Sequence, residues 1–350
     1  MHMADSLLSP AVGTAMCAVS AAAVAYSVAK IRKDELCEKK IPVIGVMGAF
    51  VFAAQMINFT IPMTGSSGHI GGGILLAAML GSFPALLAIS TVLIIQCLFF
   101  ADCGLLALGC NIFNMGVIPC LVAYPFIYRP LVKNKMTSGR ITLASIAAVA
   151  AGLQLGAFGV VLQTLFSGIT ELPFAAFVLL MQPIHLAIGI AEGMVTASVL
   201  CYVYKMRPEI MESTVEKTAV QSSVPMRKII ITFAAITLIA GGVLSLFVSS
   251  HPDGLEWSIE KVTGAAEPET EYNFTEGSAH GAAAAIQKKT AFMPNYNFKD
   301  TEKENHAQHS SKTGAAVAGI AGGAITFMLA GITVLVISFL KRKRKDAVSA

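Results

Sequence analysis

Charge is scarce in this chain. Of its 350 residues, 13% are charged and 55% are hydrophobic, whereas about 25% charged residues are usual in soluble domains. The mean hydropathy is +0.68. This balance excludes a soluble globular domain and predicts an integral membrane protein. We therefore expect membrane lipid around the chain and no nucleic-acid partner.

Several short motifs of enzymes and metal sites are missing as well. The seven cysteines include no Cys-x-x-Cys pair, so neither a zinc site nor a disulfide framework is predicted. The sequence has no Gly-x-x-x-x-Gly-Lys-Ser/Thr loop for ATP phosphates and no His-Glu-x-x-His of a zinc protease. We therefore predict that the chain is not an enzyme and carries no cofactor.

The amino terminus lacks the pattern of a secretory signal. No Lys or Arg precedes Leu7, where the first apolar run begins, and Asp5 is acidic. A cleaved signal carries a positively charged segment ahead of its apolar run. We therefore expect the first helix to stay attached and Met1 to remain in the mature protein.

Long apolar runs make up most of the sequence. A helix of about 20 apolar residues can cross a bilayer, and single runs of this kind lie at 7–29, 41–61, 141–166, 172–204, 229–249 and 314–340. The run at 70–128 is long enough for three helices, with breaks at 82–84 and 101–104, because Pro and Gly end helices. The pattern predicts an all-α polytopic membrane bundle of about seven helices, followed by two C-terminal transmembrane helices.

Basic clusters predict the orientation of these helices. They lie at 30–40, 129–140, 205–207 and 341–345, and such clusters mark cytoplasmic ends. All of them fit nine crossings of the cell membrane, with the N-terminus external and the C-terminus cytoplasmic. We expect a membrane domain at 1–205, a cytoplasmic linker at 206–228, and a C-terminal region at 229–350 with two membrane helices and an external loop.

The external loop of this topology is residues 251–312. It contains His280, His306 and His309. These histidines could gather metal loosely, but the polar composition of the segment favours a solvated loop.

The first two residues offer three nitrogens to one metal ion. The terminal amine of Met1, the backbone nitrogen of His2 and the His2 imidazole close a five-membered and a six-membered chelate ring. A fourth nitrogen would complete a square plane, which suits Ni(II) or Cu(II) better than Zn(II), Mg(II) or Ca(II). The alternative is that His2 follows an initiator methionine without a role.

His69 is the natural fourth nitrogen. It lies in a loop of small residues at 65–73, where glycines let backbone and imidazole approach an ion closely. The predicted topology places this loop on the same side as Met1 and His2. A loop histidine with no special role is the alternative, but the combination with the Met-His start favours a ligand.

Two ionisable residues lie inside the run at 172–204. His185 and Glu192 are seven residues apart and therefore share one face of a helix. Ionisable groups at membrane depth are costly and indicate function. The alternative, which we favour here, is a satisfied, buried hydrogen-bonded pair between helices.

Three segments resemble one protein family. Residues 1–10, MHMADSLLSP, are similar to the Met-His-x-x-Asp-Gly-aromatic-Leu-Ser-Pro start of the CbiM/NikM family. These are substrate-capture (S) components of energy-coupling factor transporters for cobalt and nickel. Residues 64–72, TGSSGHIGG, resemble the family's second histidine loop, and residues 108–115, LGCNIFNM, its Leu-Gly-x-Asn-x-x-Asn-Met segment. The chain departs from the pattern at Ser6, where Gly is usual, and at Leu7, where an aromatic residue is usual.

The resemblance implies a function and a ligand set. Residues 1–205 would be the metal-capture domain, and the Met1 amine, the His2 amide nitrogen and imidazole, and His69 would hold the metal. Three further residues would lie behind these ligands and orient them: Asp5, Asn111 and Asn114. The transported ion would be Ni(II) or Co(II). The partners would be a transmembrane coupling (T) subunit and cytoplasmic ATPase subunits.

The tail carries a second resemblance. Residues 252–256 read PDGLE, the signature of a small accessory subunit in nickel versions of these transporters, which here looks fused to the capture domain. A plain Pro-Asp-Gly turn is the local alternative. The signature favours nickel over cobalt. We expect metal binding to need only residues 1–205, and transport to need the tail and ATPase partners as well.

Two other functions stay open. A cobalt transporter component for cobalamin synthesis would use the same ligands. An ion-coupled secondary metal carrier would use His185 and Glu192 and would work without ATPase partners.

Overall fold

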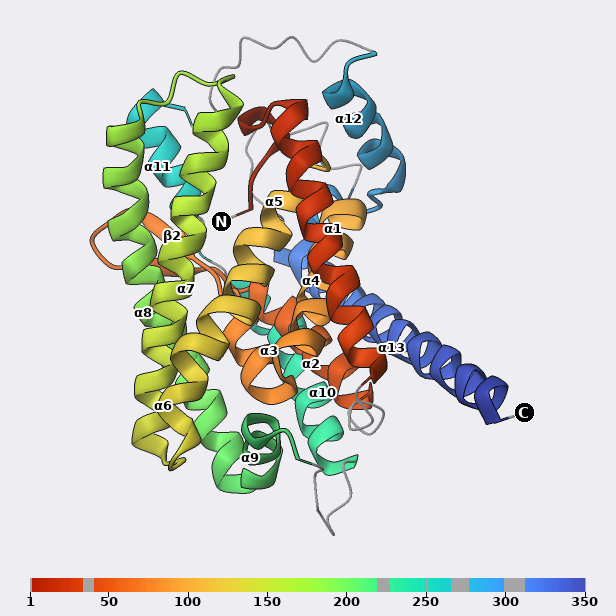
Figure 1. The fold of residues 1–350 in the computed structure, drawn as a ribbon. Coiled ribbons are helices and arrows are strands. Elements are labelled where there is room, and N and C mark those ends of the chain that lie inside the picture. Colours follow the sequence, from red (N-terminus) through yellow and green to blue (C-terminus); the bar gives the residue numbers. More distant parts are fainter. Residues whose placement is uncertain are drawn as a thin grey trace.

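The structure is a computed structural model, and it describes residues 2–33, 41–218, 227–247, 249, 251–265, 277–298 and 312–349. Long helices form a bundle, and the two-stranded hairpin of the described residues lies at its side (Figure 1). Six described segments are long and apolar enough to cross a membrane: α1 (Pro10–Lys33), α4 (Ser82–Phe100), Leu108–Lys133, α7 (Ser138–Ser167), α8 (Phe174–Met206) and Thr313–Thr333 of α13 (Lys312–Ser349). The prediction of an all-α polytopic membrane protein is confirmed.

Six of the nine predicted crossings coincide with these spans. The runs at 41–61 and 229–249 contain apolar helices of 10–17 residues, shorter than the expected length of about 20 residues. The first crossing expected in the run at 70–128 is wrong. The run at 70–128 does break at the expected places, because Gly81 separates α3 (Gly73–Leu80) from α4 and Ala101 ends α4 in a left-handed conformation. However, α3 has only 8 residues, or about 12 Å of helix at 1.5 Å per residue, against a hydrocarbon core of about 30 Å. The apolar run begins with irregular chain that enters the bundle. Hydropathy alone does not distinguish such buried irregular chain from a helix.

The shorter elements surround this irregular chain. Helix α2 (Ile41–Gln55) leads into strand β1 (Phe59–Ile61), which pairs antiparallel with β2 (Ser66–Gly68). Gly72, directly before α3, has a left-handed backbone conformation that favours glycine. The hairpin and the following loop thus carry His69 between α2 and α3.

The segment after α4 is one continuous helix with a widened middle. It consists of α5 (Leu108–Ile112), the π-helical η3 (Phe113–Tyr128) and α6 (Arg129–Lys133). Pro119 and Pro125 lie inside η3. A proline ring clashes with the carbonyl four residues back and donates no N–H, so wider turns accommodate both prolines without ending the helix.

Three of the four basic clusters lie toward one end of the bundle. The C-terminal end of α1, the helix α6, and the end of α8 where it leads into α9 (Pro208–Glu216) are all at the lower end in Figure 1, whereas the C-terminal end of α13 extends away from the bundle. Helix α9 falls within the predicted linker at 206–228 and buries Ile210, Met211 and Val215 against the bundle. Which membrane side this end faces stays a prediction.

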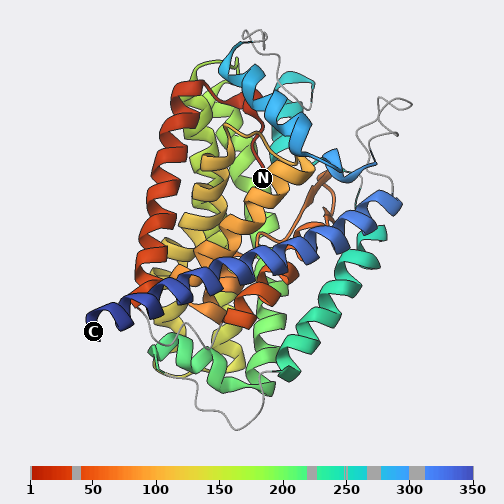
Figure 2. The same cartoon turned by 90° about the vertical axis from the view of Figure 1, so that its right-hand side faces the viewer.

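The C-terminal region packs against the first. Helix α13 crosses the side of the bundle obliquely (Figure 2) and contacts α2 and α10 (Arg227–Gly242). The contact with α10 is close because glycines meet there, and a Cβ on Gly319 would lie 2.5 Å from the carbonyl oxygen of Gly241. Four shorter helices complete the described chain: η1 (Asp5–Leu7), η4 (Leu244–Phe247), α11 (Gly254–Thr263) and α12 (Ala279–Thr290), with a single turn η5 (Pro294–Tyr296).

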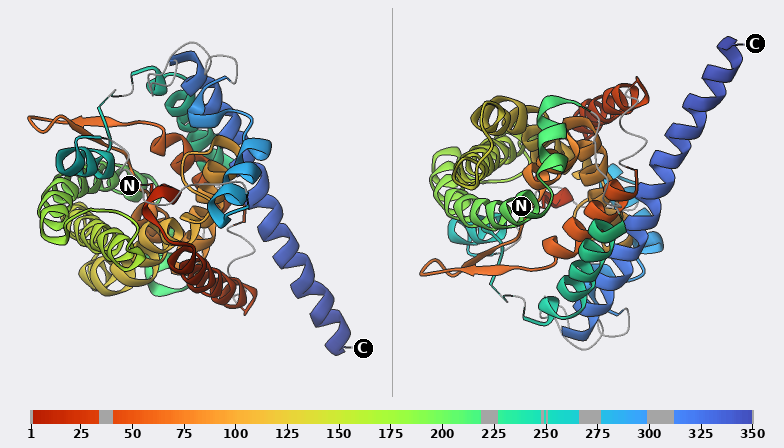
Figure 3. Two further views of the ribbon diagram at one scale, coloured as in Figure 1. Left: turned by 90° about the horizontal axis from the view of Figure 1, so that it is seen from above. Right: turned by 90° about the horizontal axis from the view of Figure 1, so that it is seen from below.

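The prediction of a solvated loop after residue 251 is wrong for its described part. Helices α11 and α12 lie at the upper end of the bundle. The His280 side chain is 2% exposed, and its Nε2 donates to the Leu8 carbonyl over 2.8 Å. His306 and His309 lie outside the described residues. Seen from above, the start of the chain lies among the helices and not at their rim (Figure 3).

Helices α1 and α5 touch through Gly109. A Cβ at this residue would lie 2.3 Å from the backbone nitrogen of Cys17, and the Ser20 hydroxyl donates to the Gly109 carbonyl over 2.6 Å. We predict that Gly109→Ala lowers the free energy of unfolding by about 1–3 kcal/mol, the usual cost of overpacking. Thermal unfolding in detergent measures the change.

Gly139→Ala is the matched control. Gly139 is exposed in the first turn of α7, with no atom within 4 Å of an added Cβ. There the same substitution should stabilise the protein by about 0.4–1 kcal/mol, because alanine restricts the unfolded chain. Equal melting temperatures for the two variants would contradict the close α1–α5 contact.

Candidate metal site

The first residues of the chain are held inside the bundle by Asn111. The Met3 N–H donates to Asn111 Oδ1 over 2.8 Å, and Asn111 Nδ2 donates back to the Met3 carbonyl over 3.3 Å. The Gly104 N–H donates to the same carbonyl over 3.1 Å. Both main-chain groups of Met3 are therefore bonded, which fixes the position of the neighbouring His2.

Asp5, two residues after Met3, anchors the same segment. Its Oδ1 accepts from the Ala107 N–H over 2.9 Å, just ahead of α5. The fit is close, because a Cβ on Gly104 would lie 1.9 Å from that oxygen. Burial raises the pKa of the Asp5 carboxyl, while the N–H groups that it accepts oppose this rise. Asp5 thus holds backbone in place.

Asn114 lies one turn below Asn111. Its amide exchanges hydrogen bonds with Gln163 of α7, over 2.7 Å and 3.2 Å. The Asn114 Nδ2 is also 3.9 Å from Met3 Sδ. Asn114 therefore supports the Met3 side chain, whereas Asn111 supports its backbone.

The two candidate histidine ligands meet. The ring centroids of His2 and His69 are 5.1 Å apart, and the ring planes differ by 18°. Burial lowers the pKa of His2 to about 3 and lowers that of His69 as well. Both imidazoles are therefore neutral near pH 7, which is the form that binds metal.

Asp102 stands beside His2. Its Oδ2 lies 3.6 Å from His2 Nδ1 and accepts from the Tyr296 hydroxyl over 2.6 Å. Burial raises the pKa of Asp102 to about 7. Asp102 is the only charged residue in the apolar run at 70–128, and an isolated ionisable residue in such a run indicates function. The prediction of a helix break at 101–104 misses this signal.

The loop that carries His69 is bonded to α8 and α2. The Gly72 N–H donates to Glu192 Oε1 over 2.9 Å, and Gln55 Nε2 donates to the Gly71 carbonyl over 2.9 Å. Gln96 in turn donates to Gln55 over 2.8 Å. Side chains from three helices therefore hold this piece of irregular backbone.

His185 and Glu192 are both buried, at 1% and 3% exposure, but they do not bond each other. His185 Nδ1 bonds the Met181 carbonyl of its own helix over 2.8 Å, whereas Glu192 holds Gly72. Seven residues of helix span about 10.5 Å, which is beyond the reach of a hydrogen bond.

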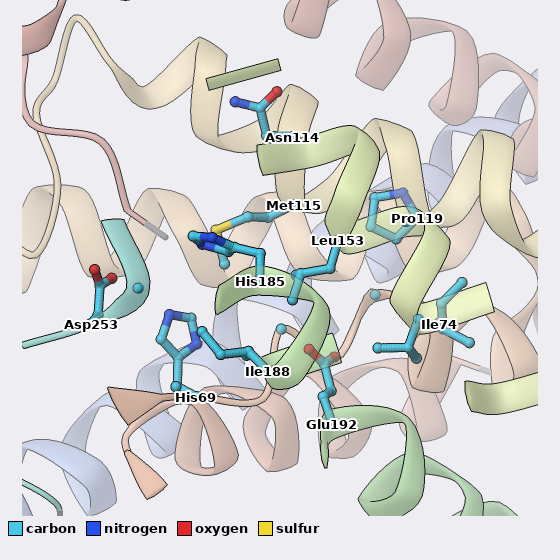
Figure 4. A pocket seen from close by; sticks show the side chains of 16 residues that line it. His69, Ile74, Asn114, Met115, Pro119, Leu153, His185, Ile188, Glu192 and Asp253 are labelled. Atoms are coloured by element: carbon cyan, nitrogen blue, oxygen red, sulfur yellow. The ribbon is translucent and has the colours of Figure 1, made fainter. Parts of the chain in front are cut away.

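A cavity lies beside the histidines, between α8, η3 and the His69 loop (Figure 4). Its polar lining residues are His69, Asn114, His185, Glu192 and Asp253, and the remaining lining is largely apolar. Asp253 comes from the C-terminal region, so both halves of the chain contribute to this wall. The sequence signal for Asp253 is the Asp-x-x-Glu capping pattern inside PDGLE.

The site can hold one transition metal ion only if the main chain supplies ligands. An imidazole nitrogen binds such an ion at about 2.0–2.1 Å, so rings with centroids about 5 Å apart are close enough to share one. Among the described residues, no group of three His, Cys, Asp or Glu side chains could hold a metal ion. Two imidazoles then need nitrogen donors from the backbone. Met1 itself lies outside the described residues.

Several known proteins are similar to this chain in sequence and in fold. Residues 2–210 match the family model for the cobalt uptake substrate-specific transmembrane region, and residues 227–339 match the PDGLE domain. A putative fused nickel transport protein NikMN of Archaeoglobus fulgidus is 33% identical over 61% of this chain and 68% of its own. The fused nickel transport protein NikMN of Rhodobacter capsulatus is 33% identical over 60% of this chain and 64% of its own.

A cobalt transport protein and a solved crystal structure are also similar to this chain. The cobalt transport protein CbiM of Sorangium cellulosum is 29% identical over 49% of this chain and 76% of its own. The crystal structure of a truncated transition metal transporter aligns with a TM-score of 0.52 and 29% identity, over 59% of this chain and 99% of that one.

We predict that Asn111→Ala weakens binding of Ni(II) or Co(II) at the candidate site about 10-fold, because the Met3 backbone loses both of its bonds to this side chain and His2 is no longer fixed. Calorimetry on the protein in detergent measures the affinity. Asn114→Ala is the control, since Asn114 does not bond the backbone of residues 2–5, and it should cost less than about 3-fold. The same loss in both variants would speak against the clamp on Met3.

Proposed function

Because the chain belongs to the CbiM family of cobalt and nickel transport proteins and carries a fused PDGLE domain, as the sequence resemblance predicted, we propose that it captures Ni(II) for an energy-coupling factor transporter. The chain is a multi-pass membrane protein. The observation that carries the proposal is the contact between the rings of His2 and His69, which lie 67 positions apart in the sequence.

The proposed ligands are four nitrogens. The Met1 amine, the His2 amide nitrogen, the His2 imidazole and the His69 imidazole form a planar set, which suits Ni(II). The bonded backbone of Met3 supports this ligand set, because it holds the start of the chain beside His69. Asp5, Asn111 and Asn114 act as the supports behind the ligands, and the ion is cargo and not a resident cofactor.

Nickel is the favoured cargo because relatives with the same fused arrangement are named as nickel transport proteins. Cobalt is the second candidate, since the family model and the Sorangium relative are described by cobalt uptake. Co(II) accepts the same nitrogen ligands. Parallel titrations with both ions separate the two.

Energy for transport comes from other subunits in this proposal. The sequence has no loop for ATP phosphates, so a transmembrane coupling subunit and cytoplasmic ATPase subunits would supply it. The N-terminus and the metal site would face the outside, and the C-terminus the cytoplasm. An ion-coupled carrier is less well supported, because Glu192 is engaged in holding Gly72.

We predict that His2→Ala and His69→Ala each weaken nickel binding at least 100-fold, because each removes one corner of the planar set. Calorimetry with Ni(II) and with Co(II) measures both affinities. His251→Ala is the control, because this side chain is exposed; His280 is unsuitable, since it is buried on Leu8. Unchanged nickel affinity in His69→Ala would refute the proposed function.

Two glycines added in front of Met1 test the amine ligand. We predict that they lower nickel affinity at least 100-fold, because the free amine moves away from the His2 amide and the five-membered ring between them is lost. A single added glycine is unsuitable, because His2 would then be third in the chain, where the amine, two amides and the imidazole form a planar four-nitrogen set of their own. Extending the chain after Ala350 by the same two residues is the control and should change nothing. Full affinity in the N-terminally extended protein would show that the terminal amine is not a ligand.

A further inference from the structure

Residues 251–263, here called the PDGLE segment, lie along the loop that carries His69. The Ser67 N–H donates to the Pro252 carbonyl over 2.8 Å, and the Ser67 hydroxyl donates to the His251 carbonyl over 2.8 Å. Ser67 and Asp253 form a parallel bridge. Strand β2 therefore has β1 on one side and the PDGLE segment on the other, two residues before His69.

The helix of this segment adds a second attachment. Trp257 of α11 donates its indole N–H to the Thr64 carbonyl over 2.9 Å. Because Thr64 lies in the turn of the hairpin and Ser67 in strand β2, the PDGLE segment is fixed to both parts of the hairpin.

The PDGLE segment and the hairpin that precedes His69 both pack against Ile188 of α8. A Cβ on Gly254 would lie 2.8 Å from Ile188 Cδ1 and 3.0 Å from His185 Cε1, and a Cβ on Gly68 would lie 2.7 Å from Ile188 Cγ2. Neither position has room for a side chain. The backbone of the PDGLE segment is thus packed directly against the helix behind the His69 loop.

The Asp253 carboxylate is fixed at this place by α11. Its Oδ1 accepts from the N–H groups of Leu255 and Glu256 over 2.8 Å and 2.9 Å, and Glu256 accepts in return from the Asp253 N–H over 3.1 Å. Donors at a helix N-terminus favour the ionised carboxylate. Asp253 lines the same cavity as His69, and Figure 4 shows the two side chains next to each other.

The C-terminal region also reaches the other histidine. The Tyr296 hydroxyl donates to the Asp102 carboxylate, which lies beside His2. His280 donates to the carbonyl of Leu8, just before helix α1. Residues on both sides of the candidate site are therefore supported from the chain beyond residue 250.

A bound divalent cation in this site needs a negative partner. The proposed ligand set carries one negative charge, on the His2 amide, and leaves one positive charge on the complex. An uncompensated charge in a buried site is costly, and a carboxylate a few ångströms away acts strongly where the dielectric constant is low. Asp253 is a carboxylate already fixed at the cavity wall.

We propose that the PDGLE segment completes the metal site of the first domain and that the Asp253 carboxylate is the counter-charge of the bound ion. Asp253 acts through its charge in this proposal and is not a ligand, and its Oδ1 is held by the N–H groups of α11. The inference rests on the proposed function. It replaces the expectation that residues 1–205 bind metal at full strength on their own.

Asp253→Asn in the full chain is the decisive variant. Asparagine caps helices as well as aspartate does, so α11 is retained while the charge is lost. We expect nickel affinity to fall about 10-fold, with an unchanged melting temperature in the absence of metal. Calorimetry is done at pH 8, because the Asp253 charge raises the pKa of Glu256 to about 7 and both carboxylates are then ionised.

Glu256→Gln is the matched control. It removes one carboxylate from the same helical turn, at an exposed position, and glutamine preserves the capping box. Its affinity should stay within about 2-fold of the parent. Gly254→Ala keeps the carboxylate but has no room for its methyl group, so it should also weaken binding, by displacing the segment.

The outcomes are distinct. Parent-like affinity in Asp253→Asn, or equal losses in Asp253→Asn and Glu256→Gln, would overturn the counter-charge. If only Gly254→Ala lost nickel affinity, the PDGLE segment would act only by covering the site, and the counter-charge proposal would be overturned as well. Both results leave the proposed function intact so long as His69→Ala abolishes binding, whereas tight binding by His69→Ala would refute the function itself.

Discussion

The polar main chain of two irregular segments must be bonded by protein, because these segments lie among membrane helices where lipid offers no hydrogen bonds. Residues 2–4 and 69–72 are the two segments. Asn111 satisfies both polar groups of Met3, and Glu192 and Gln55 satisfy Gly72 and Gly71. Each anchor comes from a different helix, so the packing of the bundle decides where the two histidines lie.

This requirement also accounts for the buried polar residues of the bundle. An unsatisfied buried donor or acceptor costs about 1–3 kcal/mol, so each anchoring side chain stabilises the fold as well as the site. The paired amides of Asn114 and Gln163 and of Gln55 and Gln96 follow the same logic. A site built this way is ordered before the ion arrives, and the ordering cost does not weaken binding.

The sequence predicts those features that depend on local pattern. Apolar length gives the long helices, and Pro84 and Gly104 mark the breaks that the structure has near Gly81 and Ala101. The Met-His start and its glycine-rich partner loop give two residues that do meet. The short α3 is missed because hydropathy does not separate buried irregular chain from helix.

Long-range contacts are the part that local pattern does not contain. Tyr296 on Asp102 and Pro252 on Ser67 join residues more than 180 positions apart. The segment after residue 251 looks solvated by composition, yet His280 is buried, because it packs against the start of the chain. Such neighbours become visible only when the helices are packed together.

Joining the PDGLE segment to the first domain in one polypeptide changes the concentration that governs their contact. A tethered segment meets its seat at an effective concentration on the order of millimolar, whatever the amount of protein in the membrane. A free subunit with the same surface would occupy the seat in proportion to its own abundance. The contact between Ser67 and Pro252 is therefore a first-order equilibrium of a single molecule, insensitive to dilution and to the ratio in which genes are expressed.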